Sequence, residues 1–128
     1  MSFQFSKHYT VEEAQALLPN IKKWFAQIEM LQLQLSKLDL RLTSLSSSGD
    51  DVGGDTVNSS IKLQAEMQAL LMEFASRGIE IKDLGRGLID FPALRNGKEI
   101  FLCWEKGEDG IEFWHPVDSG YAGREPID

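Results

Sequence analysis

The sequence predicts an α+β protein in which a long antiparallel helical hairpin packs on a small antiparallel β-sheet of three to four strands. Three observations lead to this fold: heptad-spaced apolar residues in the first half, a glycine where that pattern stops, and an Asn-Gly dipeptide in the second half. The chain of 128 residues is expected to form a single domain over residues 1–128. The hairpin would occupy residues 10–77, and a β-meander with a C-terminal tail would occupy residues 79–128.

The first helix is predicted to begin at a capping box. Thr10 is placed to cap the amides of the first turn, and Glu13 is placed to reach back to Thr10. Because Pro19 has no amide hydrogen, a kink or break is expected around Leu18–Asn20. Beyond it, the apolar residues recur at alternating spacings of three and four, which predicts a long helix with one apolar seam. The seam consists of Ile21, Trp24, Ile28, Leu31, Leu35, Leu38, Leu42 and Leu45.

Two leucines, Leu33 and Leu40, lie off this seam and indicate a second covered face. Packing against the sheet is the simpler explanation. Self-association is the other, and with the long heptad pattern it leads us to expect a homodimer through the helical hairpin.

A flexible loop is predicted over residues 46–56, which are small, polar and rich in glycine. A second helix is predicted over residues 57–77, with Leu63, Met67, Leu70 and Phe74 on its seam. It would end at Gly78, in the left-handed conformation typical of a helix C-terminus.

Four segments after Gly78 are predicted to be strands: Ile79–Leu84, Leu88–Leu94, Lys98–Glu105 and Ile111–Pro116. Asn96-Gly97 favours a two-residue turn that pairs Arg95 with Lys98. Counting back along both strands then sets Ile89 opposite Trp104.

The next connection is predicted to be a three-residue loop at Glu108–Gly110 with Gly110 left-handed. This loop sets Trp104 opposite Trp114 and Cys103 opposite His115. One face of the sheet is then apolar and faces the helices, while the other face is predicted to be exposed.

Asp90, Cys103 and His115 fall in one row across three strands of this predicted sheet. A Cys–His–Asp relay needs the histidine in the middle, whereas here the cysteine is in the middle and Asp90 would raise its pKa. No catalytic residue is therefore predicted.

A metal site is disfavoured as well. Glu112, His115 and Asp118 are spaced three apart, so Glu112 and His115 point to opposite faces of a strand. Two remaining ligands are too few for structural zinc. No metal and no cofactor are predicted.

The candidate ligand-binding residues lie in the C-terminal segment and are Trp114, His115, Asp118, Tyr121 and Arg124. Arg124 is expected to fold back onto a carboxylate near the sheet, with Asp118 the first choice. Gly120 and Gly123 permit the turn that this requires. The functional alternative is an anion clamp assisted by His115 and Tyr121.

The composition and net charge of the chain argue against some classes of binding partner. The net charge of −7, without a basic stripe, argues against binding to nucleic acid or to an anionic membrane. No signal peptide or membrane-spanning segment is apparent, and the single Cys103 excludes an internal disulfide. We therefore expect a soluble, cytoplasmic protein.

The sequence also resembles a bacterial family without assigned activity, the domain of unknown function 2203. The resemblance covers almost the whole chain. It rests on Phe5, Tyr9–Ala14, Leu17–Pro19, Gly78-Ile79, Lys82-Asp83, Gly87–Ala93, Leu102–Trp104, Gly107-Glu108, Phe113–His115, Asp118, Gly120–Arg124 and Pro126. The departure is the glycine- and serine-rich loop around Ser46–Asp55. The resemblance implies a related fold and brings no catalytic or binding residues.

Two function classes follow. The favoured one is a non-catalytic self-associating or protein-interaction module that uses the long helix, because no nucleophile–base pair is predicted. The alternative is a small-molecule (anion) binding protein or an enzyme, with its site in the His115–Arg124 segment.

Overall fold

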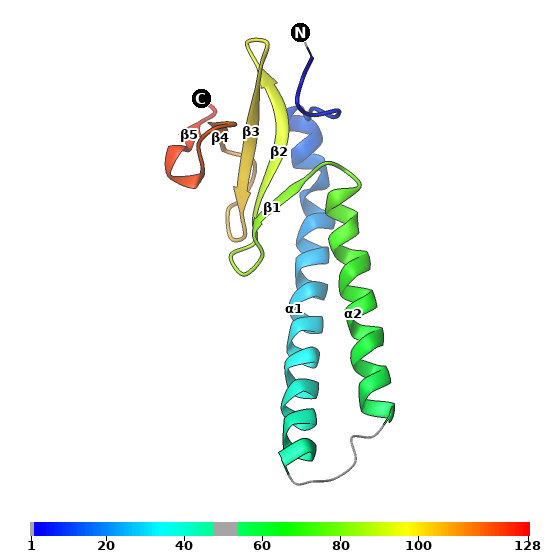
Figure 1. Cartoon of the computed structure of the whole chain (residues 1–128). Coiled ribbons are helices and arrows are strands. Elements are labelled where there is room, and N and C mark those ends of the chain that lie inside the picture. Colours follow the sequence, from blue (N-terminus) through cyan, green and yellow to red (C-terminus); the bar gives the residue numbers. More distant parts are fainter. Residues whose placement is uncertain (1, 48–53) are drawn as a thin grey trace. The chain divides into compact units, whose positions relative to one another are not determined.

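The structure, a computed structural model, describes residues 2–47 and 54–128 and confirms the α+β class (Figure 1). Two helices precede a five-stranded antiparallel sheet of order β1-β2-β3-β4-β5. The elements are α1 (Val11–Ser47), α2 (Gly54–Ala75), β1 (Glu80–Asp83), β2 (Leu88–Arg95), β3 (Lys98–Glu105), β4 (Phe113–Pro116), the 3-10 helix η1 (Tyr121–Gly123) and β5 (Glu125–Pro126). The sheet is a meander, as predicted, with one strand more than the three to four expected.

The chain forms two compact units. The sheet unit contains all five strands together with α1 up to residue 22 and the chain from residue 73 onward. The hairpin unit spans residues 23–72 and contains the remainder of both helices.

The capping box at the start of α1 is confirmed. The Glu13 amide donates to Thr10 Oγ1 at 3.1 Å, and the Thr10 amide donates to Glu13 Oε1 at 2.9 Å. The break expected at Pro19 is wrong, because α1 continues through it. Leu18 and Ile21 on either side are 2% and 0% exposed. Their burial, worth about 1.5–3 kcal/mol each, offsets the loss of one helical hydrogen bond.

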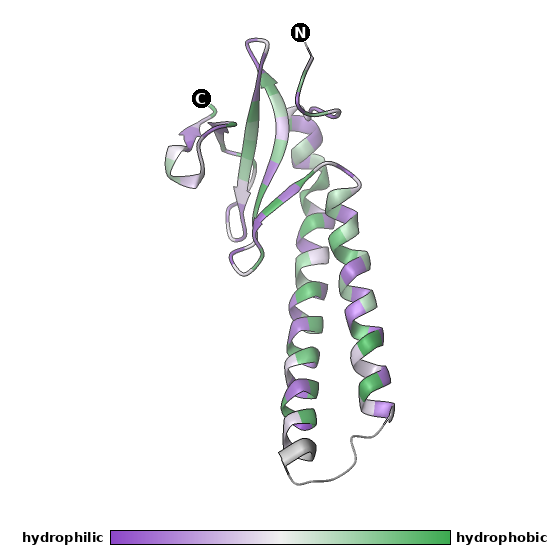
Figure 2. Ribbon diagram, in the orientation of Figure 1, coloured by the Kyte–Doolittle hydropathy of each residue, from purple (hydrophilic) through white to green (hydrophobic). Residues whose placement is uncertain are grey.

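Within the hairpin unit, both helices carry an apolar stripe, visible as green bands in Figure 2. Ile28 and Leu31 are buried and Leu35, Leu38 and Leu42 are half-buried, while the side chain of Leu45 lies outside the described residues. The predicted loop over residues 46–56 is shorter, because α1 reaches Ser47 and α2 begins at Gly54. Its remaining residues, 48–53, lie outside the described part. Neither helix, within the described residues, is long and apolar enough to cross a membrane.

The end of α2 confirms the predicted glycine cap. Gly78 has a φ of +73°, and the Ile79 amide donates to the Phe74 carbonyl at 3.1 Å. Both Phe74 and Ile79 are buried, which is the apolar contact that accompanies this cap. The helix itself ends at Ala75, two residues earlier than expected.

The predicted register is confirmed between β2 and β3 and wrong between β3 and β4. Arg95 pairs with Lys98 and Ile89 with Trp104, as the Asn-Gly turn requires. Trp114, however, pairs with Leu102 instead of Trp104, which shifts β4 by two residues.

The connection before β4 explains this shift. The left-handed residue is Gly107, with a φ of +101°, and not Gly110. Ile111 is buried, and its amide donates to Gln15 Oε1 at 2.9 Å. A Cβ atom at Gly110 would lie 2.8 Å from the same Gln15 oxygen. The chain therefore packs against the first turns of α1 before it enters β4.

Both faces of the sheet are covered, so the predicted exposed face is wrong. Asp90, Phe101, Cys103 and His115 are all no more than 3% exposed. The Phe5 ring lies 5.2 Å from the Phe101 ring, and the C-terminal tail adds β5 beside β4. Sequence patterns missed β5 because it has only two residues.

Glu99 holds the segment before α1, and this contact leads to a pH-dependent prediction. Its carboxylate accepts hydrogen bonds from the Gln4 and Phe5 amides at 2.8 and 2.9 Å and contacts His8 Nε2 at 2.8 Å. Partial burial by itself would raise the pKa of Glu99, but these hydrogen bonds lower the pKa below its usual value of 4.5. The contribution to stability is thus present above pH 4.5 and is lost as the pH falls through the lower folded-state pKa.

Glu99→Gln should therefore lower stability at pH 7, and the difference from wild type should shrink in acid. Hydrogen exchange at the Gln4 and Phe5 amides should be faster in this variant. Glu112→Gln makes the same charge change at an exposed side chain and serves as the control. Equal exchange rates in both variants would contradict the assignment.

Candidate functional site

A buried carboxylate–imidazole pair lies at the centre of the sheet unit. His115 Nε2 lies 3.0 Å from Asp90 Oδ2, and both side chains are 2% exposed. His115 Nδ1 lies 2.8 Å from the Pro116 carbonyl oxygen. Because a carbonyl only accepts, Nδ1 carries a hydrogen and donates it. One proton is then shared between Nε2 and Oδ2, and the pair is neutral overall.

The register places these two groups within reach across β3. Asp90 pairs with Cys103, and His115 pairs with Phe101, two residues further along the same face of β3. His115 is therefore not directly in line with Cys103, and its ring meets Asp90 diagonally. The sequence placed Asp90 correctly, but the two-residue error at β4 set Cys103 between the two partners.

Cys103 lies beside this pair as a buried free thiol. Its sulfur, an oxygen of Asp90 and a ring nitrogen of His115 all lie within 4.8 Å of one another. Burial and the neighbouring Asp90 carboxylate raise the pKa of Cys103 to about 12, although Arg124 acts in the opposite direction. An activated nucleophile needs a lowered pKa, and the surroundings of Cys103 act in the opposite direction.

The second oxygen of Asp90 stands out in this cluster. Burial raises the pKa of Asp90, and the neighbouring His115 lowers it in part. The Cys103 thiol beside the carboxyl also lowers the pKa of Asp90, but Asp90 Oδ1 is buried and forms no hydrogen bond of ordinary geometry with the described residues. A buried acceptor left unsatisfied costs about 1–3 kcal/mol, so this atom is a point at which a ligand would be stabilised.

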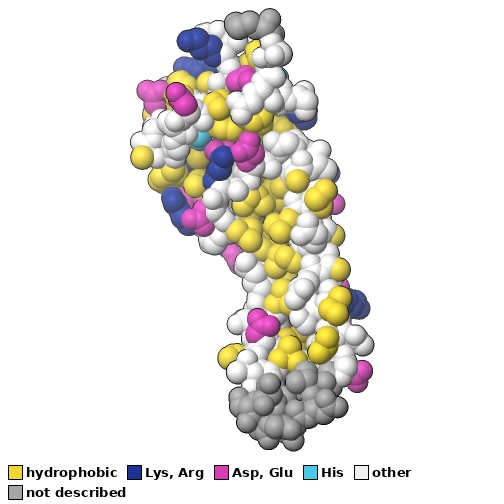
Figure 3. Space-filling view, in the orientation of Figure 1, with side chains coloured by type: hydrophobic (Ala, Val, Ile, Leu, Met, Phe, Trp, Pro, Cys, Tyr) yellow, Lys and Arg dark blue, Asp and Glu magenta, His cyan; other side chains and the backbone are white. Residues whose placement is uncertain are grey.

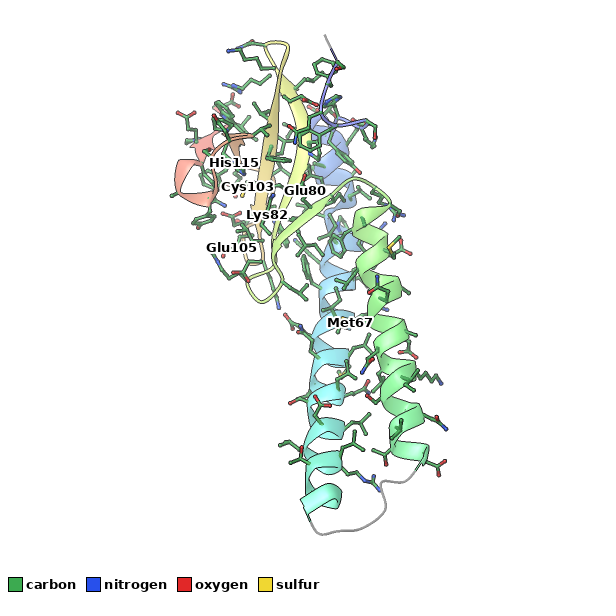
Figure 4. All side chains as sticks on the ribbon, viewed as in Figure 1. Met67, Glu80, Lys82, Cys103, Glu105 and His115 are labelled. Carbon is green, nitrogen blue, oxygen red and sulfur yellow. The ribbon has the colours of Figure 1, made fainter. Side chains whose placement is uncertain are left out.

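A cavity of about 190 Å³ opens beside the cluster. Its wall consists of Lys82, Leu88, Asp90, Phe101, Cys103, His115, Val117, Ser119, Gly120 and Tyr121. Figure 4 labels Lys82 on β1, Cys103 on β3 and His115 on β4 of the sheet unit. Strands β1 to β4 and the η1 segment thus all contribute to one wall.

Of the five predicted ligand-binding residues, all of them described in the structure, His115 and Tyr121 line this cavity. The Trp114 side chain lies on the opposite face of β4. The Arg95 guanidinium lies over its ring, 4.6 Å from the ring centre. Asp118 is exposed. Sequence reasoning missed Lys82, for which the chain offered no distinctive pattern.

Arg124 does fold back onto a carboxylate, but its partner is Glu108 and not Asp118. Its two terminal nitrogens lie 3.2 and 2.7 Å from the two Glu108 oxygens, and Nη1 lies 3.8 Å from Cys103 Sγ. Burial alone would lower the pKa of Arg124, but the bonds to Glu108 and Cys103 raise it above its usual value.

Two further contacts fix this guanidinium in place. It stacks at 3.9 Å on the Phe113 ring and at 4.3 Å on the Tyr121 ring. The turn before it is close, because a Cβ atom at Gly123 would lie 2.7 Å from Ser119 Oγ, so a larger residue there would force the Ser119 side chain to move. Arg124 is therefore committed to holding the tail against β3 and the loop that follows it.

Comparison with known proteins bears on the family. No curated protein and no solved structure matches the chain. The family model described as "Uncharacterized conserved protein (DUF2203)" matches residues 7–127, which include both helices, all five strands and the Asp90–Cys103–His115 cluster. The chain belongs to the DUF2203 family.

Proposed function

We propose that this protein binds a small ligand in the cavity beside Asp90 and His115, and that binding, not covalent catalysis, is its function. The observation that carries the proposal is Asp90 Oδ1, a buried acceptor without a partner among the described residues, in the wall of a cavity. Pockets with a few convergent polar groups and a perturbed carboxyl are the usual location of ligand sites.

The size and charge of the cavity limit the ligand. A water molecule, with one non-hydrogen atom, occupies about 30 Å³, so a cavity of about 190 Å³ suits a ligand of roughly six non-hydrogen atoms. An anion is poorly matched, because Arg124 is bound to Glu108 and the Lys82 ammonium contacts Glu80 at 2.6 Å. A cation or a hydrogen-bond donor suits Asp90 better. With a net charge of −7, nucleic acid is not a proposed ligand.

A thermal-shift screen of small amines, amides and alcohols tests this proposal. At least one compound should raise the melting temperature of the wild type, and Val117→Phe, which fills the cavity, should abolish that rise. Val57→Phe makes the same change on the exposed surface of α2 and should leave it intact. A rise that persists in Val117→Phe would place the ligand elsewhere and overturn the proposal.

A second function, self-association through the hairpin, is favoured by a specific observation. Leu33 and Leu40 of α1 are 53% and 70% exposed, and Ile61 of α2 is 59% exposed. Figure 3 shows hydrophobic side chains along the hairpin unit. No described residue of that unit covers these side chains, and each would be stabilised by about 1.5–3 kcal/mol on burial. A second copy of the same hairpin offers a matching surface.

Sedimentation equilibrium tests this second proposal. The wild type should be a dimer at tens of micromolar, and Leu33→Gln/Leu40→Gln should be a monomer. Leu94→Gln makes the same change at an exposed leucine of β2, outside the hairpin unit, and should remain a dimer. A monomeric wild type would contradict self-association and leave the ligand proposal untouched.

A further inference from the structure

We infer that Asp90, Cys103 and His115 form a binding site for one divalent transition-metal ion of the zinc class, with a further coordination position facing the cavity. The inference deepens the proposed function, because it names the chemical class of the ligand. It rests on the position of three donor atoms and on the unpartnered oxygen among them.

The three donors are of the types that zinc binds, and they converge. One atom from each residue lies within 4.8 Å of the other two. Ligands around tetrahedral zinc lie about 3.3–3.8 Å apart, given bond lengths of about 2.0–2.3 Å. A movement on the order of 1 Å therefore brings the donors to bonding positions. They project from three adjacent strands, β2, β3 and β4, which limits their freedom to separate.

The surroundings of His115 orient it as a ligand. Its Nδ1 donates to the Pro116 carbonyl oxygen, so Nε2 faces Asp90 and Cys103. A histidine ligand to a metal almost always donates its other ring nitrogen in this way. Asp90 Oδ1, which forms no hydrogen bond of ordinary geometry with the described residues, is the second acceptor available to an ion at this point.

Charge balance favours a divalent ion. Without the ion, the Cys103 thiol holds one proton and the Asp90–His115 pair shares another, so the cluster is neutral. An ion M²⁺ that binds the thiolate, the carboxylate and the neutral imidazole displaces both protons, and the cluster stays neutral. A neutral product matters in a buried site, because an uncompensated charge is expensive there.

The donor set also selects among ions. One thiolate and one imidazole suit zinc, cobalt or a similar ion, whereas magnesium and calcium need several oxygen ligands. Arg124 Nη1 lies 3.8 Å from Cys103 Sγ, where it stays outside the coordination shell and donates to the thiolate. With three protein ligands, the remaining position belongs to water or to a small ligand in the cavity, as in zinc sites that keep an open position.

Titration of the metal-free full-length protein with Co²⁺ tests the inference directly. One ion per chain should bind and produce a thiolate-to-cobalt charge-transfer band in the near ultraviolet. The chain has a single cysteine and two histidines, so the band reports on Cys103 alone. Competition with Zn²⁺ should remove it. In weakly buffered solution at pH 7, about two protons should be released for each ion bound.

Substitutions distinguish residues that coordinate the ion from residues that only lie elsewhere in the chain. Cys103→Ser should lose the band, and His115→Ala and Asp90→Asn should each weaken binding by about 100-fold or more. His8→Ala, the matched control at the other histidine, should bind like the wild type. Circular dichroism checks that each variant is folded. If His115→Ala is not folded, Cys103→Ser and Asp90→Asn still test the inference.

Absence of Co²⁺ binding, binding without the band, or equal weakening by His8→Ala would each overturn the metal site. The ligand proposal fails separately. If an organic compound stabilises the wild type and not Val117→Phe while Co²⁺ does not bind, the cavity is a ligand site without a metal. If neither binds, both proposals are wrong.

Discussion

Trp104→Ala is expected to lower the free energy of unfolding by about 3–5 kcal/mol, the usual loss when a large buried aromatic side chain is removed. Trp104 is 1% exposed and is among the largest fully buried side chains of the protein. Its indole Nε1 donates to the Glu108 carbonyl oxygen at 3.1 Å, so the substitution also loosens the loop that holds Glu108. A loss of this size is a large part of the total stability of a small protein, about 5–15 kcal/mol.

Chemical denaturation measures this loss. Unfolding is followed by far-ultraviolet circular dichroism, because the substitution removes a tryptophan and so changes the fluorescence signal. Trp114→Phe is the matched control, because Trp114 is half-buried and the substitution keeps an aromatic ring for Arg95. It should have a much smaller effect than Trp104→Ala. A loss below about 1 kcal/mol for Trp104→Ala, the range of mild substitutions, would contradict the core described for the sheet unit.

Arg124→Ala is expected to lower the free energy of unfolding by about 2–4 kcal/mol. The Arg124 and Glu108 side chains are only 11% and 19% exposed, so the expected loss lies between that of an exposed ion pair and that of a buried one. The same substitution removes the stacking on Phe113 and Tyr121. Had Arg124 served as a strained anion clamp, its removal would leave stability unchanged or raised.

A second arginine provides the control. Arg86 also contacts a carboxylate, Glu105, at 2.7 Å and also lies over Tyr121, but its side chain is 45% exposed. Because the exposed pair is screened by solvent, Arg86→Ala should lower stability much less than Arg124→Ala. A double-mutant cycle of Arg124→Ala with Glu108→Gln isolates the pair. Equal losses for both arginines would show that the Arg124 contact is not the stronger of the two.

The features that were predicted correctly depend on residues close together in the sequence. The Thr10–Glu13 capping box, the Gly78 cap and the Asn96-Gly97 turn are each set within a few residues. Backbone sterics and one or two hydrogen bonds determine them. The heptad pattern of α1 was equally clear, because a helix repeats its exposure every turn. These local rules were sufficient for the fold class.

The features that were missed depend on contacts across the chain. Gln15 accepts the Ile111 amide across 96 positions, and this one contact accompanies the displaced register of β4. No residue pattern near Ile111 predicts this hydrogen bond. The partner of Arg124 was missed for a similar reason: Glu108 was assigned to a tight loop, whereas the observed connection presents its carboxylate to the tail.

In the candidate site, too, local patterns were predicted correctly and contacts between distant residues were not. Asp90, Cys103 and His115 were predicted to lie in one row, but a catalytic relay was not predicted because the cysteine was placed between the other two. A shift of two residues keeps every side chain on its face of the strand and still changes which side chains touch. Membership of the cluster was therefore predictable from alternation along the strands, but its internal contacts were not.

Because Cys103 is buried, the rate at which a thiol reagent labels it measures how often the surrounding structure opens. The chain has no other cysteine, and this one is 1% exposed, so a thiol reagent reaches it only while the surrounding structure is open. The labelling rate, divided by that of a free thiol, gives the open fraction and hence a free energy of opening. If this free energy is smaller than that of global unfolding, the structure around the cavity opens while the rest of the chain stays folded, and a ligand has a route inward.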